Sequence, residues 1–167
     1  MSTNQVAVVM GSDSDLPVVS ETIKLLGEFG IDCEVRVMSA HRTPDEVHIF
    51  ATEAESRGIA VIIAAAGGAA HLAGVVASRT TLPVIGIPME SAALRGMDSL
   101  LSTVQMPAGV PVATVAIGRA GAVNAAVLAL QILALSDDRL KTKLRKYKTA
   151  LVKKVQAKDE KVRKQFE

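Results

Sequence analysis

The chain has 167 residues, of which 49% are hydrophobic and 22% are charged, and this size and composition predict one ordinary α/β domain with ample core material. A single cysteine, Cys33, excludes an internal disulfide and a cysteine-based metal knuckle. No basic segment precedes the first apolar run, and the uncharged residues 120–135 include Asn124 and Gln131. We therefore expect a cytoplasmic protein without a membrane span.

The net charge of +2 conceals an asymmetry between the two ends of the chain. Residues 137–167 hold 12 of the 19 Lys and Arg and 5 of the 17 Asp and Glu, a charge of +7, which leaves −5 for residues 1–136. Such a basic tail could bind nucleic acid, but its apolar residues recur at helical spacing: Leu140, Leu144, Tyr147, Leu151 and Val155. We expect a single domain over 1–136, a basic helical extension over 137–167, and no nucleic-acid partner.

The first half of the chain predicts two strand-helix units. The run QVAVVMG indicates a strand that stops at Gly11, and LPVVSETIKLLGEFG indicates a helix. The next run, IDCEVRV, alternates apolar and polar residues, which is typical of a strand near the edge of a sheet with one solvated face. A helix is expected from about Pro44 to Arg57, with Gly58 closing it and with Thr43 and Glu46 forming a capping box.

Three further apolar segments, IAVIIAAAGG, LPVIGIP and VPVATVAIG, do not alternate, as expected of strands buried on both faces. Five strands alternating with helices predict a doubly wound parallel sheet. Ligands of such sheets bind outside the carboxyl ends of the strands. This rule selects the loops GSDSD, SAHRTP and AAGGAAH at residues 11–15, 39–44 and 65–71.

The loop GSDSD opens a helix, where backbone N–H groups and the helix dipole favour an anion. Ser14 or Asp15 would suffice as the helix cap, so Gly11 and Ser12 are surplus to capping, which favours ligand contact. Neither a GxGxxG nor a GxxxxGK[ST] motif is present. A dinucleotide or ATP is therefore not expected.

The other two loops supply candidate proton carriers and a phosphate ligand. Arg42 precedes a helix N-terminus and could hold a phosphate, and His41 could move protons to and from a substrate. Solvated loop residues are the alternative, but the density of the cluster with Ser39 favours function. In AAGGAAH the glycines allow either close approach of a ligand or close helix packing, and His71 faces the same mouth. His48, which has no motif around it, is interpreted as structural.

Six motifs together resemble the N5-carboxyaminoimidazole ribonucleotide mutase family of purine biosynthesis, over about Val6 to Leu135: VVMGSDSD, SAHRTP, AGGAAHLAG, PVIGIPMESAAL, QMPAGVPV and AIGRAGAVNAA. The resemblance implies a flavodoxin-like three-layer α/β/α sandwich with a five-stranded parallel sheet. It also implies a homo-octamer and the conversion of N5-carboxyaminoimidazole ribonucleotide to 4-carboxyaminoimidazole ribonucleotide (CAIR). No ATP, metal or other cofactor is implied.

The resemblance also implies roles for individual residues. His41 would be the catalytic acid and base. Substrate would be bound by eight residues: Ser12 and Asp15 at the ribose and phosphate, Ser39 and Arg42 on the phosphate side, Gly67, Gly68 and Ala69 along the imidazole and carboxylate, and His71 close by. Asp15 is assigned to the ribose because a carboxylate accepts hydrogen bonds from two hydroxyls but repels phosphate.

Two alternatives remain open from the sequence. The first is an aminoimidazole ribonucleotide carboxylase that uses free CO₂, a sister class that lacks the counterpart of His71. The second is a nucleotide-binding module without catalysis, against which His41 argues. Leu16 and Ala73 depart from the family, which often has tryptophan and proline there. Residues 120–135, apolar nearly all round as a helix, are expected to be covered in part by a neighbouring subunit.

Overall fold

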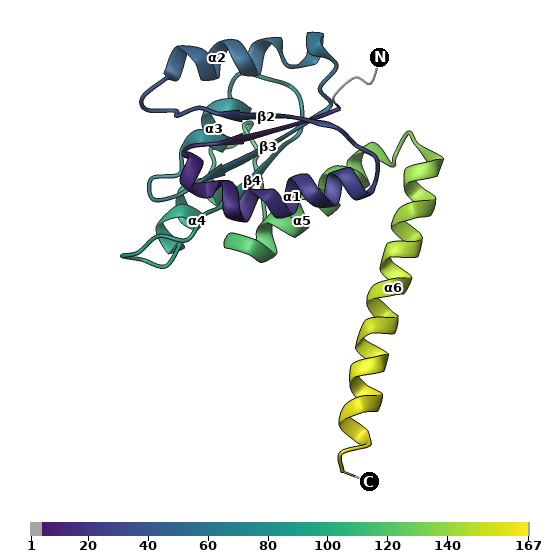
Figure 1. Cartoon of the computed structure of the whole chain (residues 1–167). Helices are drawn as coiled ribbons and strands as arrows, with labels where there is room; N and C mark the ends of the chain where they lie inside the picture. The colour runs from purple at the N-terminus through teal and green to yellow at the C-terminus, as the bar shows by residue number, and fades with distance from the viewer. Residues whose placement is uncertain (1–4, 167) are drawn as a thin grey trace. The chain divides into compact units, whose positions relative to one another are not determined.

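The structure is a computed structural model that describes residues 5–166 (Figure 1). The chain divides into two compact units, residues 1–129 and 130–167. The boundary expected between residues 136 and 137 stays a prediction. The first unit holds these elements: β1 Val6–Met10, α1 Leu16–Glu28, β2 Cys33–Val37, α2 Pro44–Glu53, β3 Val61–Ala66, α3 Leu72–Ala77, β4 Val84–Pro88, α4 Met97–Val104, β5 Ala113–Thr114, and the first part of α5 Gly118–Leu133.

All five strands are parallel and lie in the order β2-β1-β3-β4-β5. The chain passes from β1 to β2 on one side and then returns to add β3 on the other side of β1. The loops after β1 and β3 therefore diverge and leave a crevice at the carboxyl ends of these strands. This is the flavodoxin-like order, so the expected fold is confirmed.

The central strands carry the core. Every residue of β1 and β4 is buried, as is all of β3 except its last residue, Ala66. Figure 1 shows α2 and α3 on one face of the sheet and α1 on the other. Val47 and Phe50 of α2 pack with Leu72 and Val76 of α3 in one cluster over that face. Because both faces are covered, these strands are continuously apolar, as expected.

The two edge strands differ from the sequence-based expectation. β2 does lie at an edge, but its apolar side chains are not sheltered: Val35 is 39% and Val37 is 53% exposed. β5 has only two residues, and Ala113 is exposed. The expectation of a strand buried on both faces is therefore wrong here. β5 pairs only with β4, and Pro111, two residues before it, has no N–H for a ladder bond.

Helix α2 begins at Pro44 as expected but ends earlier, at Glu53. A 3₁₀ turn then covers the residues up to Arg57, and Gly58 ends it in the left-handed conformation with φ 86°. The expected capping box is wrong, because the Thr43 side chain makes no cap bond. Its hydroxyl instead accepts from the Ser39 N–H at 3.0 Å and donates to the Ser39 carbonyl at 3.2 Å. Thr43 thus braces the loop before α2.

The second unit contains the end of α5 and the long helix α6, Asp138–Arg163. The Asp137 carboxylate caps α6 by accepting from the N–H groups of Arg139 and Leu140, so the expected C-terminal helix is confirmed. Within α6, Leu140 and Leu144 are buried. Across residues 5–166, no helix is both long and apolar enough to span a membrane.

Candidate active site

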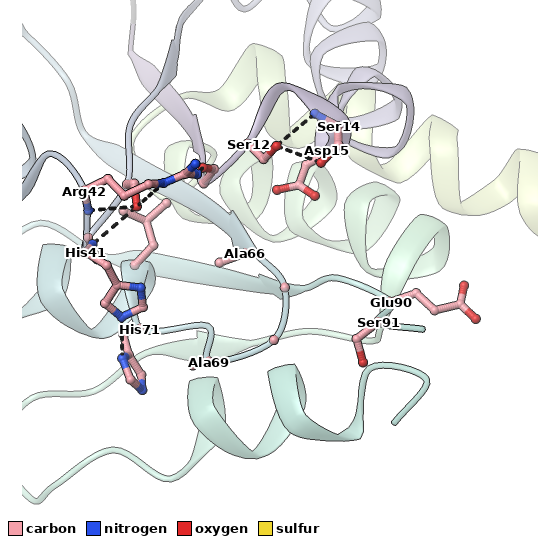
Figure 2. A pocket seen from close by; sticks show the side chains of 16 residues that line it. Ser12, Ser14, Asp15, His41, Arg42, Ala66, Ala69, His71, Glu90 and Ser91 are labelled. Carbon is pink, nitrogen blue, oxygen red and sulfur yellow. Dashed lines mark hydrogen bonds between the residues drawn. The ribbon is translucent and has the colours of Figure 1, made fainter. Parts of the chain in front are cut away.

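The loops at the carboxyl ends of four strands surround one cavity of about 510 Å³ (Figure 2). It contains all nine residues that the sequence selected. The lining also holds residues that the sequence did not select. The complete lining is Gly11, Ser12, Ser14, Asp15, Ser39, Ala40, His41, Arg42, Ala66, Gly67, Gly68, Ala69, His71, Leu72, Glu90 and Ser91.

The loop after β1 is held by its own serines. The Ser12 hydroxyl accepts from the Ser14 N–H at 3.2 Å and from the Ser14 hydroxyl at 2.8 Å, which makes Ser12 the cap of a short 3₁₀ helix, Asp13–Asp15. The expectation that Ser12 is surplus to capping is therefore wrong.

Asp15 supplies a half-buried carboxylate to this side of the cavity (Figure 2). Burial raises the pKa of Asp15, and the charge of Asp13 raises it further, whereas a hydrogen bond from the Ser12 backbone opposes the rise. A carboxylate that lacks a cation beside it attracts hydroxyl donors and repels anions. The geometry therefore suits a polyol at Asp15 better than a phosphate.

The loop after β2 is organised around Ser39. The Ser39 hydroxyl accepts from the backbone N–H groups of His41 at 3.3 Å and of Arg42 at 3.2 Å, and it lies 3.5 Å from the Arg42 Nε. The Arg42 Nη2 donates to the Gly11 carbonyl at 3.2 Å. The guanidinium thus bridges the loops after β1 and β2 and remains exposed to the cavity. These bonds to the Ser39 hydroxyl turn the chain so that Arg42 and His41 both line the cavity.

His41 and His71 meet across the cavity rim although 30 residues separate them in the chain. The His41 Nε2 lies 2.8 Å from the His71 Nδ1, and the rings are edge to face with centroids 4.9 Å apart. Figure 2 shows the pair at the side of the cavity opposite Asp15. One ring nitrogen of His41 is therefore engaged, and the other is available to a ligand.

The glycines after β3 serve the cavity rather than helix packing. Gly68 has φ 64°, a conformation that side chains disfavour, and a Cβ on Gly67 would meet only Met89 at 3.5 Å. Close packing is instead found at Gly74 in α3, where an added Cβ would lie 2.9 Å from the Met106 sulfur. Close approach of a ligand to Gly67 and Gly68 stays a prediction, which their place in the cavity lining favours. Gly67 and Gly68 leave the cavity wall without side chains, and Gly74 allows Met106 to pack closely against α3.

Glu90 and Ser91, which follow β4, also line the cavity; they lie in the motif PVIGIPMESAAL but are not among the residues predicted to form the site. The rule that ligands bind at carboxyl ends of strands could have identified them. The Ser91 hydroxyl donates to the Asp98 carboxylate at 2.7 Å and accepts from the Gly96 N–H at 3.2 Å. The bond from Ser91 lowers the pKa of Asp98. This network holds the loop on the β4 side of the cavity.

The fold and the site define an α/β protein of flavodoxin-like topology whose cavity, at the carboxyl ends of the strands, is lined by a guanidinium, carboxylates and two imidazoles. The family model described as AIR carboxylase matches residues 5–154. The chain belongs to this AIR carboxylase family.

Curated relatives agree with this assignment. A protein of Pyrococcus horikoshii named N5-carboxyaminoimidazole ribonucleotide mutase is 57% identical over 153 residues, which cover 92% of this chain and 85% of the relative. A protein of Mycobacterium leprae with the same name is 58% identical over 155 residues, covering 93% and 90%. Among solved structures, Treponema denticola PurE is 29% identical with a TM-score of 0.84, covering 93% of this chain and 96% of that one.

Proposed function

We propose that this chain converts N5-carboxyaminoimidazole ribonucleotide to CAIR, with His41 as the group that moves the proton. Membership of the family and the mutase relatives support the reaction. The observation that carries the site is the convergence of Arg42, Asp15 and His41 on one cavity. A nucleotide substrate needs a cation for its phosphate, a hydrogen-bond acceptor for its ribose hydroxyls and an acid-base group at its reacting base. Arg42, Asp15 and His41 supply these three groups.

The substrate is held by its phosphate and its ribose. Arg42 binds the phosphate because a guanidinium gives charge-assisted hydrogen bonds, and Ser39 can donate its own hydroxyl proton while its oxygen holds the turn. The Asp15 carboxylate accepts from the ribose hydroxyls, with Ser12 beside it. The base then extends along Gly67, Gly68 and Ala69 toward the histidines.

The reaction requires His41 to give one proton to the substrate and to take one proton back. As the carbamate C–N bond breaks and CO₂ departs, protonated His41 gives its proton to the nitrogen that becomes the exocyclic amine. C4 of the imidazole then attacks the retained CO₂, and neutral His41 removes the C4 proton, which restores its starting state. His71 occupies one nitrogen of His41, so the other faces the substrate.

CO₂ must remain beside the imidazole between the two steps. The wall formed by Gly67, Gly68 and Ala69 carries no polar side chain and admits the reacting base closely. Holding the two reactants together supplies the effective concentration that free CO₂ lacks. A small, apolar wall also limits the water that could hydrate CO₂.

The deciding assay compares product formation with and without bicarbonate. A mutase forms CAIR from the carbamate substrate when no bicarbonate is added, and we expect this result. A carboxylase forms product only from aminoimidazole ribonucleotide with added bicarbonate, and a nucleotide-binding module forms none. The mutase relatives favour the first reading, and either of the other outcomes contradicts it.

We also propose that the chain assembles as a homo-octamer in the cytoplasm. Several apolar side chains between residues 94 and 104 stay open to solvent in the single chain: Leu94 59%, Met97 51%, Leu101 50% and Val104 46%. In α5, Asn124 and Gln131 are exposed while Val127 and Leu128 are half-buried, so this helix is covered only in part within one chain. Light scattering at micromolar concentration should give the mass of a closed assembly. A monomer mass with the fold intact contradicts the proposal.

A further inference from the structure

Strand β2 has one edge that no strand of residues 5–166 pairs with. It lies at the end of the sheet and pairs only with β1, residue by residue from Cys33 to Val37 and without a bulge. Edge strands are commonly blunted by proline, by lysine or by a bulge, because their unpaired backbone groups bind another strand. The sequence of β2, CEVRV, contains neither proline nor lysine. This edge is therefore open to a further strand.

The free backbone groups on this edge belong to the odd-numbered residues of β2. The Met38 N–H donates to the Met10 carbonyl at 3.0 Å, so the backbone groups of even-numbered residues face β1. Successive residues of a strand direct their N–H and C=O groups to opposite sides. The groups of Cys33, Val35 and Val37 therefore point away from β1 and form a row of donors and acceptors.

The side chains of β2 divide between the two faces of the sheet. Glu34 and Arg36 lie on the α2 side, where they line one groove together with Phe50 of α2. Val35 and Val37 lie on the opposite side and are 39% and 53% exposed. The edge strand thus has a face with one acidic and one basic residue, and an apolar face that is covered only in part.

A second copy of β2, running antiparallel, matches both features in one register. Odd-numbered residues must lie opposite each other, because their backbone groups are the free ones. A two-fold axis at Val35 places Cys33 of each copy opposite Val37 of the other. It also places Glu34 opposite Arg36, at the positions between hydrogen-bonded pairs where side chains approach most closely. An axis at Glu34 or at Arg36 would instead place like charges opposite each other.

The charges of β2 leave Arg36 able to reach a second copy. Within one chain the Glu34 carboxylate lies 3.2 Å from the Arg57 Nε and 3.6 Å from Arg36. The Arg36 side chain is 51% exposed, whereas that of Glu34 is 21% exposed. Arg57 therefore holds Glu34 in place while Arg36 can turn toward Glu34 of the other copy. Charges of opposite sign then alternate along and across the two strands.

We propose that β2 pairs with β2 of a second copy of this chain about a two-fold axis at Val35, so that the two sheets become continuous. Each of the three opposed pairs of odd-numbered residues exchanges two backbone hydrogen bonds. Val35 and Val37 are covered by the same residues of the second copy. Such a contact is self-complementary, as a two-fold interface must be. It depends neither on the reaction proposed above nor on the total number of subunits.

Amide hydrogen exchange of the wild-type chain, measured residue by residue, tests the pairing without a substitution. An unpaired edge predicts fast exchange at Val35 and Val37 and slow exchange at Arg36, whose N–H faces β1. In the pair, both valine amides should exchange roughly tenfold more slowly once about nine-tenths of the chains are paired. Arg36→Glu puts like charges opposite each other and should restore the fast exchange. Fast valine amides in the wild type, or equally slow ones in both proteins, overturn the proposal.

Val37→Cys supplies a covalent test. Directly opposite Cα atoms of a hydrogen-bonded antiparallel pair lie about 5.5 Å apart, which a disulfide can span. Cys33, the one cysteine of the sequence, should then join the new thiol of the second copy under mild oxidation. Both bonds link the same two chains, so we expect covalent dimers and no higher ladder on non-reducing electrophoresis.

Ile49→Cys is the matched control for this cross-link. Ile49 lies on α2 and is 53% exposed, as Val37 is, but it is not part of the edge. Its new thiol should give only the background yield of dimers. Equal yields in the two variants, or a ladder of higher oligomers from Val37→Cys, contradict the pairing.

Charge exchange in the Val37→Cys background tests the register. Arg36→Glu and Glu34→Arg each give β2 two like charges, so each alone should lose about tenfold in dimer yield. Refolded together, the two chains place opposite charges across the axis, and dimers of mixed composition should return. Circular dichroism checks the folding of each variant, because Glu34→Arg also removes a partner of Arg57. No recovery between folded chains refutes the register, and amide exchange of the wild type decides the proposal where a variant does not fold.

Discussion

Replacement of Arg42 by alanine tests how the nucleotide is anchored. Arg42 is the guanidinium that lines the cavity, and its Nη2 makes one 3.2 Å bond to the Gly11 carbonyl at an exposed position. Because that internal bond is solvent-accessible, its loss should cost little stability. The loss of a charge-assisted bond to the phosphate should cost about 1.5–3 kcal/mol of binding free energy. That range corresponds to a roughly 10- to 150-fold rise in Kd.

Titration calorimetry with CAIR measures this change without turnover. Arg42→Lys should lie between alanine and wild type, since an ammonium keeps the charge but not the planar fork. Arg79→Ala, which removes an exposed guanidinium outside the cavity lining, is the matched control and should leave Kd unchanged. If Arg42→Ala binds CAIR as tightly as wild type, the phosphate lies elsewhere and the assignment of the loop after β2 is refuted.

Three further predictions follow from single residues. His41→Asn should abolish turnover while the Kd for CAIR changes by less than roughly tenfold, because only proton transfer is lost; retained turnover in a steady-state assay contradicts the role of His41. Gly121→Ala should lower the melting temperature by many degrees or prevent folding, because the added Cβ would clash with the Ala116 carbonyl oxygen; an unchanged melting curve contradicts that packing. Burial raises the pKa of Asp15 above its ordinary 3.8, so Asp15 should lose its charge as the pH falls through that raised value, and the affinity for CAIR should weaken there. Asp15→Asn should bind CAIR more weakly than wild type and lack this change at acid pH. An identical pH dependence of binding in both proteins contradicts the ribose assignment.

Much of the fold follows from local patterns in the sequence. Continuous apolar runs ending in glycine or proline identified β1, β3 and β4, and the alternation in β2 identified an edge strand. Each of these patterns depends only on residues a few positions apart, so it can be recognised without the rest of the chain. The pattern failed at β5, where an apolar run of similar composition forms a strand of only two residues.

The candidate site was partly predictable for a related reason. Parallel strands bring their carboxyl ends to one edge, so polar loops after β1, β2 and β3 could be expected to meet there. Glu90 and Ser91 were not predicted as site residues, although they lie in the motif PVIGIPMESAAL and follow β4 at the same edge. The partners of Ser12 and Thr43 were also missed, since a hydroxyl within reach of several backbone groups can cap a helix or brace a loop equally well.

The sequence by itself determined the order of strands and helices, the loops that carry chemistry and the charge asymmetry between residues 1–136 and 137–167, because these depend on composition and spacing along the chain. Only the tertiary structure decided that His41 lies against His71 and that Arg42 reaches Gly11. It also decided that Gly68 shapes the cavity while Gly74 admits Met106. The physical reason is that these contacts join residues far apart in the chain, and their distances are set by how the strands pair and the helices pack.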